Sequence, residues 1–485
     1  MKQYKMWIGG KWVDAESGKT YAVYNPATEE EIAQVALGDR VDVDKAVAAA
    51  RQAFPIWSKK PQAERSQVAM KIAALFREHS DVLGKTDVLD HGTPAKRAPA
   101  SVARLADRFE WAAYNSRSLM GHTVPQSSDV TVYLQREPIG VIALITPWNI
   151  PLGMIVQKLA PALAVGNTCI IKPPSIDSLA ALKMCEILDT LGLPPGTINI
   201  VTGPGGTVGN ALATHRGVDM IAFTGSCEVG KELISLSSQT VKRLQLELGG
   251  KNPIIICEDA DLNTASTEMM NGQMMNSGQT CAAPGRFYVH EKVYDEFIEK
   301  CIASIAKNWV VGDPNDDKTT MGPLVSAEHR NHVEACIKSG IDQGAKLILG
   351  GKRPTKAPMN KGYYVVPAIF THVKQNMTIA REEIFGPVVC IMEKFNSDDK
   401  VIEMANDTTF GLTSYVWTRD NARAMRFANK IAAGTVVLNN AGSGGAELPW
   451  GGYKESGIGK EGSLYGLYEY TNLKRIQVDL MTPKK

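Results

Sequence analysis

The sequence predicts an α/β protein with two open sheets of mainly parallel strands, and three observations support this fold class. From residue 141 onward, short runs rich in β-branched residues alternate with longer amphipathic runs, a pattern typical of βαβ units. A second alternation of the same kind follows from about residue 253. The 485 residues are too many for one hydrophobic core, and the 44% that are hydrophobic can fill two or three.

The first alternation predicts a doubly wound parallel sheet. Its expected strands are residues 141–146, 168–173, 197–203, 218–225 and 242–250. The amphipathic runs between them are expected to be helices, and they are residues 153–165, 178–192, 206–215 and 228–237. Because strands joined through such helices run parallel, this order predicts one Rossmann-type sheet.

The second alternation predicts another α/β unit, and two further segments belong to neither unit. The expected strands of this unit are residues 286–293, 345–351, 388–395, 414–420 and 434–440. The two further segments, residues 130–138 and 470–480, have an extended pattern. They can pair across a subunit interface or form ordinary edge strands, and the sequence leaves both possibilities open.

The charge balance argues against two classes of partner. Lys and Arg total 53 against 51 Asp and Glu, so there is no excess positive charge for binding a nucleic acid or an anionic membrane. The first residues lack the apolar core of a signal peptide, and the apolar runs are shorter than a membrane span. We therefore expect a cytoplasmic protein with no nucleic-acid or membrane partner.

Cysteine and histidine are scattered along the chain, which argues against metal and disulfide sites. Eight of each occur, without the CxxC or HxxxH spacing of zinc or redox sites. His329 and His332 lie in a polar, helix-like run and are expected to be solvated surface residues. No metal is predicted, while a hydrolase with a Cys/His pair stays open because such partners meet in space rather than in sequence.

One edge of the first predicted sheet gathers polar residues. Open α/β sheets bind ligands beyond the carboxyl ends of their strands, and these ends carry Asn149, Lys172, Gly203, Gly205, Gly225, Ser226 and Glu247. Ser226 is placed to cap a helix whose free N–H groups can hold an anion, although capping alone explains it equally well. The glycines at positions 203, 205, 206 and 209 miss the G-x-G-x-x-G fingerprint.

Cys281 lies in the stretch NSGQTCAAPGR, residues 276–286, with no histidine nearby. Taken alone, it is expected to be a small apolar core residue. The wider sequence changes this interpretation, because eight stretches match one family in order: TPWNIP, IIKPPS, FTGSCEVG, LELGGKNP, NSGQTC, REEIFGPV, LNN and PWGGYKESGIGKE. Over nearly its whole length, the chain resembles the NAD(P)-dependent aldehyde dehydrogenase superfamily.

The resemblance implies a division into domains. A Rossmann-type cofactor-binding domain would comprise residues 1–120 and 141–252, and an α/β catalytic domain would comprise residues 253–440. Residues 121–140 and 441–485 would form the small β extension through which members of the family assemble. A homodimer or homotetramer is therefore expected.

The resemblance also assigns the chemistry. Cys281 matches the family's nucleophile, Glu247 its general base and Asn149 its side-chain oxyanion donor. The thiolate attacks an aldehyde, the Asn149 amide and the Cys281 N–H stabilise the oxyanion, hydride passes to the nicotinamide, and the base activates water to hydrolyse the thioester. A helix N-terminus or a nearby cation is expected to lower the thiol pKa from about 8.5.

For the cofactor, NAD or NADP, the family positions map onto Thr146, Pro147, Trp148, Lys172, Ser175, Gly205, Gly225, Ser226, Leu248, Glu383 and Phe385. Ser175 stands where many NAD-using relatives have glutamate. The carboxylate that would repel a 2′-phosphate is then missing, so NADP is expected to be accepted alongside NAD. Two alternatives stay open: Asp177 restores an acidic partner, or Ser175 merely caps the helix that begins near Ser178.

Substrate contacts are implied at Met154, Gln157, Thr280, Ala282 and Trp450. The loop before Trp450 offers glycines and no cation, so an uncharged aldehyde of moderate size is expected unless Arg104 or Arg108 reaches the pocket. Cys227, Met274 and Trp450 depart from the residues usual in the family. Two other functions remain: a CoA-acylating enzyme, against which Glu247 argues, and a catalytically silent protein on the same fold.

Overall fold

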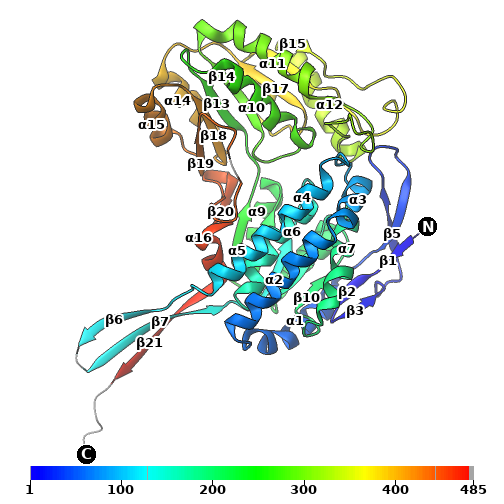
Figure 1. Ribbon diagram of the computed structural model, residues 1–485, viewed down its shortest axis with the longest axis vertical. Helices are drawn as coiled ribbons and strands as arrows, with labels where there is room; N and C mark the ends of the chain where they lie inside the picture. The colour runs from blue at the N-terminus through cyan, green and yellow to red at the C-terminus, as the bar shows by residue number, and fades with distance from the viewer. Residues whose placement is uncertain (1, 128, 443, 480–485) are drawn as a thin grey trace, which may run out of the picture.

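The first alternation forms an eight-stranded sheet in the computed structural model, which describes residues 2–127, 129–442 and 444–479 (Figure 1). The strand order is β20-β12-β11-β8-β9-β10-β2-β3. As the sequence predicts, its centre is parallel, with β12 (Arg243–Glu247), β11 (Met220–Thr224), β8 (Val141–Ile145), β9 (Thr168–Lys172) and β10 (Ile198–Ile200). Antiparallel strands close both sides, namely β20 (Gly457–Ile458), β2 (Met6–Ile8) and β3 (Lys11–Val13).

Helix α6 (Pro151–Ala164) shows how this body is built. It packs against β8 and β9 and also against the outer helices α2 (Gln62–Glu78) and α5 (Ala106–Ser116). Its Ile155 and Leu159 are fully buried in one core with Leu144 of β8. Enclosure on several sides suits a helix that is apolar around most of its circumference. The other helices of this body are α1 (Arg40–Ser58), α3 (Ser80–Asp90), α4 (Ala98–Arg104), α7 (Leu179–Leu188), α8 (Asn210–Thr214) and α9 (Cys227–Ser237).

The second alternation forms a seven-stranded sheet in the other body of Figure 1. In spatial order the strands are β15 (Lys346–Leu349), β16 (Ala368–Val373), β17 (Val388–Met392), β14 (Pro284–Val289), β13 (Asn252–Ile256), β18 (Thr413–Trp417) and β19 (Thr435–Leu438). All neighbours are parallel except β15 and β16. The helices are α10 (Leu262–Met274), α11 (Tyr294–Asn308), α12 (Ala327–Asp342), α13 (Thr378–Arg381), α14 (Asp398–Asn406) and α15 (Asn421–Lys430).

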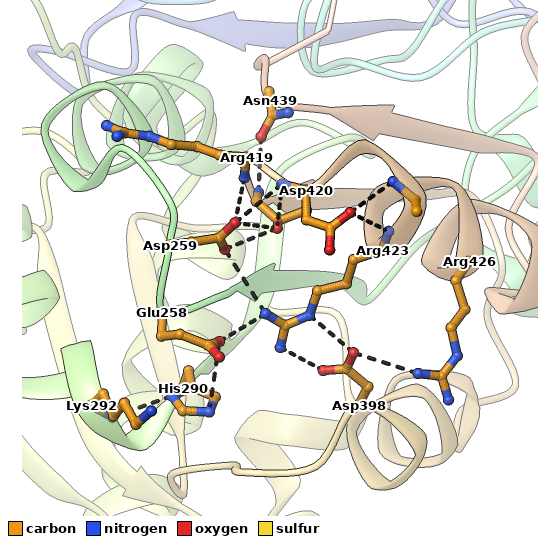
Figure 2. A network of polar contacts seen from close by, with 12 residues as sticks. Glu258, Asp259, His290, Lys292, Asp398, Arg419, Asp420, Arg423, Arg426 and Asn439 are labelled. Carbon is orange, nitrogen blue, oxygen red and sulfur yellow. Dashed lines mark hydrogen bonds and ion pairs between the residues drawn. The ribbon is translucent and has the colours of Figure 1, made fainter.

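The carboxyl edge of this second sheet is occupied by the protein's own charged groups (Figure 2). Arg423 of α15 donates to Glu258 at 2.8 Å and to Asp398 at 2.9 and 2.6 Å. Asp259, which follows β13, accepts from the Thr418 hydroxyl at 2.9 Å and from the Arg419 N–H at 2.8 Å. The edge at which an open α/β sheet commonly binds its ligand is therefore bridged by ion pairs and hydrogen bonds in this body.

The two extended segments pair with each other. β7 (Val130–Pro138) and β21 (Thr471–Asp479) are antiparallel from Pro138 opposite Thr471 to Val130 opposite Asp479, and β6 (His122–Ser127) adds a third strand beside β7. Figure 1 shows this sheet as an arm that projects from the first body. Residue 480, the end of the second expected segment, lies outside the described residues.

The expected bridging segment 441–485 is divided between two places. β21 lies in the arm, but β20 pairs with β12 in the first sheet. Helix α16 (Ser463–Glu469) packs on α5 and α6. Strand β20 and helix α16 therefore pack with the first body, while β21 lies in the arm.

Candidate active site

The candidate site lies between the carboxyl edge of the first sheet and the amino ends of strands in the second. Glu247 is the last residue of β12, and Asn149 follows β8. From the other body, Cys281 lies three residues before β14 begins, and Glu383 and Phe385 lie shortly before β17. Two segments far apart in sequence thus bring polar residues to the same junction.

The side chains of Cys281 and Glu247 interact, and each shifts the pKa of the other. The Cys281 residue is half-buried, whereas Glu247 is 3% exposed. Burial, together with the carboxylates of Glu247 and Glu383, raises the pKa of the Cys281 thiol well above its ordinary value. The expectation that a cation or helix N-terminus lowers this pKa is therefore wrong, because the neighbours that act on the thiol are carboxylates.

The Glu247 carboxylate has an environment suited to a base. Burial and the charge of Glu461 raise the pKa of Glu247 to about 8, while Lys158, the hydrogen bond from Trp450 and the Cys281 side chain oppose that rise. The Trp450 indole Nε1 donates to Oε1 of Glu247 at 3.2 Å. A carboxylate with a pKa near neutrality can take up and release a proton at working pH.

Asn149 is hydrogen-bonded to the segment that carries Cys281. Its Nδ2 donates to the Gln279 carbonyl at 3.0 Å, and the residue is 4% exposed. The Cys281 carbonyl accepts from Asn252 Nδ2 at 2.8 Å, which ties the start of the second sheet to the same segment. An amide and a backbone N–H are therefore held close to the thiol.

The segment just before Cys281 has an unusual backbone. Asn276 and Ser277 have φ values of 53° and 57°, and Gly278 follows at 75°. The left-handed region costs a residue with a Cβ roughly 1–2 kcal/mol. A Cβ on Gly278 would lie 2.1 Å from the Gly386 carbonyl oxygen, so glycine is required there. Ser277 Oγ donates to the Gly322 carbonyl at 2.8 Å and helps to hold the turn.

At the carboxyl edge of the first sheet, several cofactor candidates lie on adjacent strands. Thr146 is buried, and its Oγ1 has no hydrogen-bond partner among the described residues. Burial lowers the pKa of Lys172 to about 8, and its Nζ donates to the Pro173 carbonyl at 3.2 Å. Ser226 is exposed and caps α9, with its Oγ accepting from the Val229 N–H at 3.3 Å. A buried hydroxyl without a partner, an amine and an open helix end suit a polar, anionic ligand.

Ser175 and Asp177 have neither of the roles that the sequence left open for them. Ser175 Oγ donates to the Gly203 carbonyl at 2.9 Å, so it does not cap α7. The N–H of Leu179 at the start of α7 instead donates to Asp90 at 2.8 Å. Asp177 is fully buried and faces His91, with 3.3 Å between Oδ2 and Nδ1. It therefore does not replace the missing glutamate at the surface of the site.

An aromatic cluster covers the junction on the side of the second body. The rings of Trp148 and Phe385 meet edge to face at 5.3 Å, and the His329 ring lies 4.8 Å from Trp148. His329 Nε2 lies 2.7 Å from the Phe385 carbonyl oxygen, and burial lowers the pKa of His329 to about 4. The prediction of a solvated surface residue is therefore wrong for His329, which is half-buried and neutral.

Glu383 lies close to the turn after β12. Its Oε1 accepts from the Gly250 N–H at 3.0 Å, and a Cβ on Gly249 would lie 2.2 Å from Oε2. Burial raises the pKa of Glu383 to about 7 against this hydrogen bond and the charge of Lys251. The glycine pair thus lets the carboxylate contact the backbone beside Leu248, whose own N–H donates to the Ser456 carbonyl at 2.9 Å.

Comparison with known proteins gives one consistent result. Residues 12–476 match the model of the aldehyde dehydrogenase family. The chain belongs to the aldehyde dehydrogenase family. It is 40% identical to a betaine aldehyde dehydrogenase of Bacillus subtilis over 477 residues, which cover 97% of this chain and 96% of the relative.

Solved aldehyde dehydrogenases have the same fold. An aldehyde dehydrogenase of Bacillus cereus, solved as an NAD+ complex, superposes with a TM-score of 0.96 at 39% identity, covering 99% of this chain and 97% of that one. A betaine aldehyde dehydrogenase of Staphylococcus aureus, in complex with NAD+, superposes with a TM-score of 0.96 at 35% identity. The match covers 99% of this chain and 95% of that one. The expected fold class and enzyme class are both confirmed.

In this aldehyde dehydrogenase, the expected substrate residues other than Trp450 lie on two segments, the chain beside Cys281 and helix α6. Thr280 is 7% exposed, the Ala282 carbonyl accepts from the Tyr415 hydroxyl at 2.9 Å, and Met154 is half-buried on α6. Gln157 is 8% exposed and its Oε1 has no partner among the described residues. Gln157 and Arg108 line one cavity with Trp111 and Ala446. Arg108 therefore shares a cavity with Gln157, whereas Arg104 is exposed on α4.

Several residues beside the aldehyde dehydrogenase site were not singled out from the sequence. Lys158 is fully buried in α6, forms an ion pair with Glu461 and donates to Thr224 Oγ1 at 2.5 Å. A lysine among the apolar residues of this helix indicates a buried ionic partner, so the sequence could have predicted this pair. His91 carried no comparable signal, because its partners Asn276 and Asp177 are distant in sequence.

The part of the chain that the structure describes contains no cluster of three or more His, Cys, Asp or Glu side chains able to hold a metal ion. Its helices include none with the length and apolar character needed to cross a membrane.

Proposed function

We propose that the chain is a hydrolytic aldehyde dehydrogenase in which Cys281 is the nucleophile, Glu247 the proton acceptor and Asn149 the oxyanion donor. The observation that carries the proposal is that the Glu247 carboxylate and the Cys281 thiol interact with each other and affect each other's pKa. Because the thiol pKa is raised, little free thiolate exists near neutral pH. Transfer of the thiol proton to Glu247, whose pKa is about 8, supplies the nucleophile as it attacks.

The proposed reaction has two stages, formation of a thioester on Cys281 and hydrolysis of that thioester. Sγ of Cys281 bonds to the aldehyde carbon, its proton moves to Glu247, and the carbonyl oxygen gains an electron pair beside the Asn149 amide and the Cys281 N–H. When bound, a nicotinamide ring supplies the acceptor for the hydride that leaves this carbon. Glu247 releases its proton to solvent and then takes another from the water that attacks the thioester. The C–S bond breaks, Cys281 regains a proton, and a carboxylic acid leaves.

For the cofactor, we propose NAD, with NADP also accepted. The Thr146 hydroxyl, Trp148, the Lys172 amine and the α9 N-terminus at Gly225 and Ser226 would hold the dinucleotide, with Pro147, Gly205 and Leu248 shaping the same edge. Glu383 would accept from the nicotinamide ribose, and Phe385 would pack beside the ring. The proposal of NAD is supported by the NAD+ complexes of the Bacillus cereus and Staphylococcus aureus relatives. NADP acceptance depends on Ser175, which places no carboxylate at the surface of the site.

For the substrate, we propose an uncharged aldehyde of moderate size. The charges near the pocket balance, because Arg108 and Lys158 are opposed by Glu447 and Glu461. Relatives named betaine aldehyde dehydrogenases suggest a cationic aldehyde instead. The guanidinium of Arg108 beside Gln157 argues against a quaternary ammonium group at that position.

We further propose that the first body binds the cofactor, that the second completes the catalytic site, and that the arm joins copies of the chain into a dimer or tetramer. In the part of the chain that the structure describes, β21 and β6 are the two outer strands of the arm. The arm also exposes the apolar side chains Tyr133, Leu473, Ile476 and Val478. Exposed apolar strands of this kind are commonly covered by another chain.

One experiment separates the proposed function from its alternatives. Formation of reduced cofactor is followed with a panel of aliphatic, aromatic, amino and acidic aldehydes, with NAD or NADP, and with or without CoA. Turnover without CoA and release of a free acid support the hydrolytic enzyme. Turnover only with CoA supports the acylating alternative, and cofactor binding without turnover on any aldehyde supports the silent protein.

A further inference from the structure

His91 joins two parts of the site that the proposed chemistry does not connect. It follows α3 directly and is 2% exposed. Its Nε2 lies 3.0 Å from Oδ1 of Asn276, and its Nδ1 lies 3.3 Å from Oδ2 of Asp177. Asn276 belongs to the turn before Cys281, whereas Asp177 belongs to the segment between β9 and α7 that carries Lys172 and Ser175.

The Asn276 amide can have only one orientation here. Its Nδ2 donates to the Asn149 carbonyl at 2.5 Å and to the Gln279 carbonyl at 3.2 Å. The Gln279 carbonyl also accepts from the Asn149 side chain. Because both carbonyls are acceptors, the nitrogen must face them and Oδ1 must face His91. His91 Nε2 must therefore carry a proton and donate it.

The other ring nitrogen faces Asp177 without a hydrogen bond. His91 Nδ1 and both carboxylate oxygens of Asp177 are buried and have no hydrogen-bond partner among the described residues, although Nδ1 and Oδ2 lie 3.3 Å apart. Burial raises the pKa of Asp177 well above its ordinary value, with a further contribution from Asp87. The other polar and charged groups around this pair are Asp90, Lys172, and Tyr21 with its partner Ser178.

We propose that His91, which faces Asp177, is a positioning residue that holds the oxyanion donor Asn149 and the Cys281 turn in place through Asn276. The inference rests on the proposed roles of Cys281 and Asn149. It also couples the segment of Lys172 and Ser175 to the nucleophile, because Asp177 lies on that segment. His91 contacts neither the thiol nor Glu247, so it acts through Asn276 alone.

Two substitutions of similar size distinguish the two ring nitrogens. The amide of His91→Gln reaches the position of Nε2 and can still donate to Asn276, whereas that of His91→Asn reaches only the position of Nδ1. We expect H91Q to keep most of the wild-type kcat and H91N to lose about tenfold, because small displacements of reacting groups are costly. The KM for NAD should stay near the wild-type value in both, since neither variant removes a proposed cofactor contact.

A second readout does not need the cofactor. The rate at which iodoacetamide alkylates Cys281, followed by mass spectrometry of its peptide, measures the reactivity of the thiol. That reactivity depends on the position of the thiol and on its neighbours. We expect the rate to change by about fivefold in H91N and little in H91Q. Thermal unfolding midpoints of both variants show whether a loss comes from general destabilisation, which would affect the matched pair alike.

A double variant tests the route through Asn276. If His91 acts through that amide, H91N combined with Asn276→Ser should be no slower than Asn276→Ser alone. Equal losses in H91N and H91Q, unchanged kcat and alkylation in H91N, or additive losses in the double variant would each overturn the inference. If the wild-type protein oxidised no aldehyde, the proposed function would be overturned instead. The two failures are therefore distinguishable.

Discussion

The indole Nε1 of Trp450 donates to Oε1 of Glu247 at 3.2 Å, and the same carboxylate interacts with the Cys281 thiol. Trp450 and Glu461 are paired through both backbone N–H groups, at 2.8 and 2.7 Å, so the segment carrying the indole is fixed. The carboxylate is thus held between an indole and a thiol, and Trp450 affects both its direction and its affinity for a proton.

Trp450→Phe should raise the pKa that governs the steady-state rate. The indole stabilises the charged carboxylate, so removing it favours the protonated form, and Glu247 titrates above its present value of about 8. Hydrogen bonds to charged groups contribute about 1.5–3 kcal/mol, so we expect a shift of about one to two pH units and a lower rate at pH 7. The measurement is kcat against pH. Trp111→Phe is the control, because Trp111 lines the neighbouring cavity; an equal shift there would contradict the assignment.

Cys281→Ala should abolish aldehyde oxidation and leave cofactor binding nearly intact. The thiol lies at the acyl centre and is not itself a proposed dinucleotide contact, and most of those contacts lie near the ends of β8 and β9 and at the start of α9. Turnover and NAD affinity are measured on the same preparation. Cys227→Ala is a matched control, since Cys227 is the other half-buried cysteine and bonds the Glu455 carbonyl at 3.1 Å. Residual turnover above a few per cent in C281A would remove Cys281 from the mechanism.

Glu247→Gln should slow steady turnover about 10²–10⁴-fold, the contribution usual for a general base. Its amide cannot accept a proton from water, so the thioester accumulates after a burst of reduced cofactor. Because Glu247 also interacts with the thiol, we expect the burst itself to slow, but less than the steady phase. Stopped-flow absorbance resolves the two phases. A steady rate that remains equal to wild type would exclude Glu247 as the base.

Ser175→Glu should shift cofactor preference toward NAD. A carboxylate at this half-buried position would repel a 2′-phosphate, and charge-assisted contacts of about 1.5–3 kcal/mol correspond to at least tenfold in kcat/KM for NADP. Ser175→Ala removes the bond to the Gly203 carbonyl without adding charge and serves as the control. If wild type already rejects NADP, or if S175E and S175A behave alike, the argument from Ser175 fails.

Lys158→Met should destabilise the protein by about 3–5 kcal/mol, because Glu461 would remain buried without its partner. The pKa of Glu247 should also rise, since the positive charge of Lys158 opposes its protonation. Unfolding by urea measures the first effect, and the pH dependence of kcat measures the second. Adding Glu461→Gln to the same chain should recover much of the stability. If Lys158→Met alone were as stable as wild type, the Lys158–Glu461 ion pair would contribute little to the free energy of unfolding.

The sequence predicted those parts of the fold that depend on local pattern. Residues 141–146 and 168–173 are apolar and β-branched, and they become β8 and β9 within about one residue at each end. By contrast, β20 consists of Gly457 and Ile458, which are a strand only because they pair with Leu246 and Glu247. His329 was misjudged for a similar reason: its neighbours in sequence are polar, while its packing partners Trp148 and Phe385 are distant in sequence.

The same distinction, between features set by local sequence and features set by distant contacts, applies to the candidate site. The strand ends indicated Asn149, Lys172 and Glu247, and the family motifs indicated Cys281. The thiol pKa could not be predicted, because it depends on carboxylates from three separate segments, Glu247, Glu383 and Glu461. The proton state of His91 likewise depends on how the Asn276 amide is turned, which only the assembled structure determines.

The ion pairs at the carboxyl edge of the second sheet have a consequence for ligand-linked unfolding. That edge satisfies its charges internally, so a dinucleotide bound at the first sheet adds its free energy chiefly to the first body. A ligand at a hundred times its dissociation constant contributes about 2.7 kcal/mol to the state that binds it. With cofactor bound, the second body should therefore become the half that opens first under heat or protease, and cleavage should move toward residues 253–440 as NAD is added.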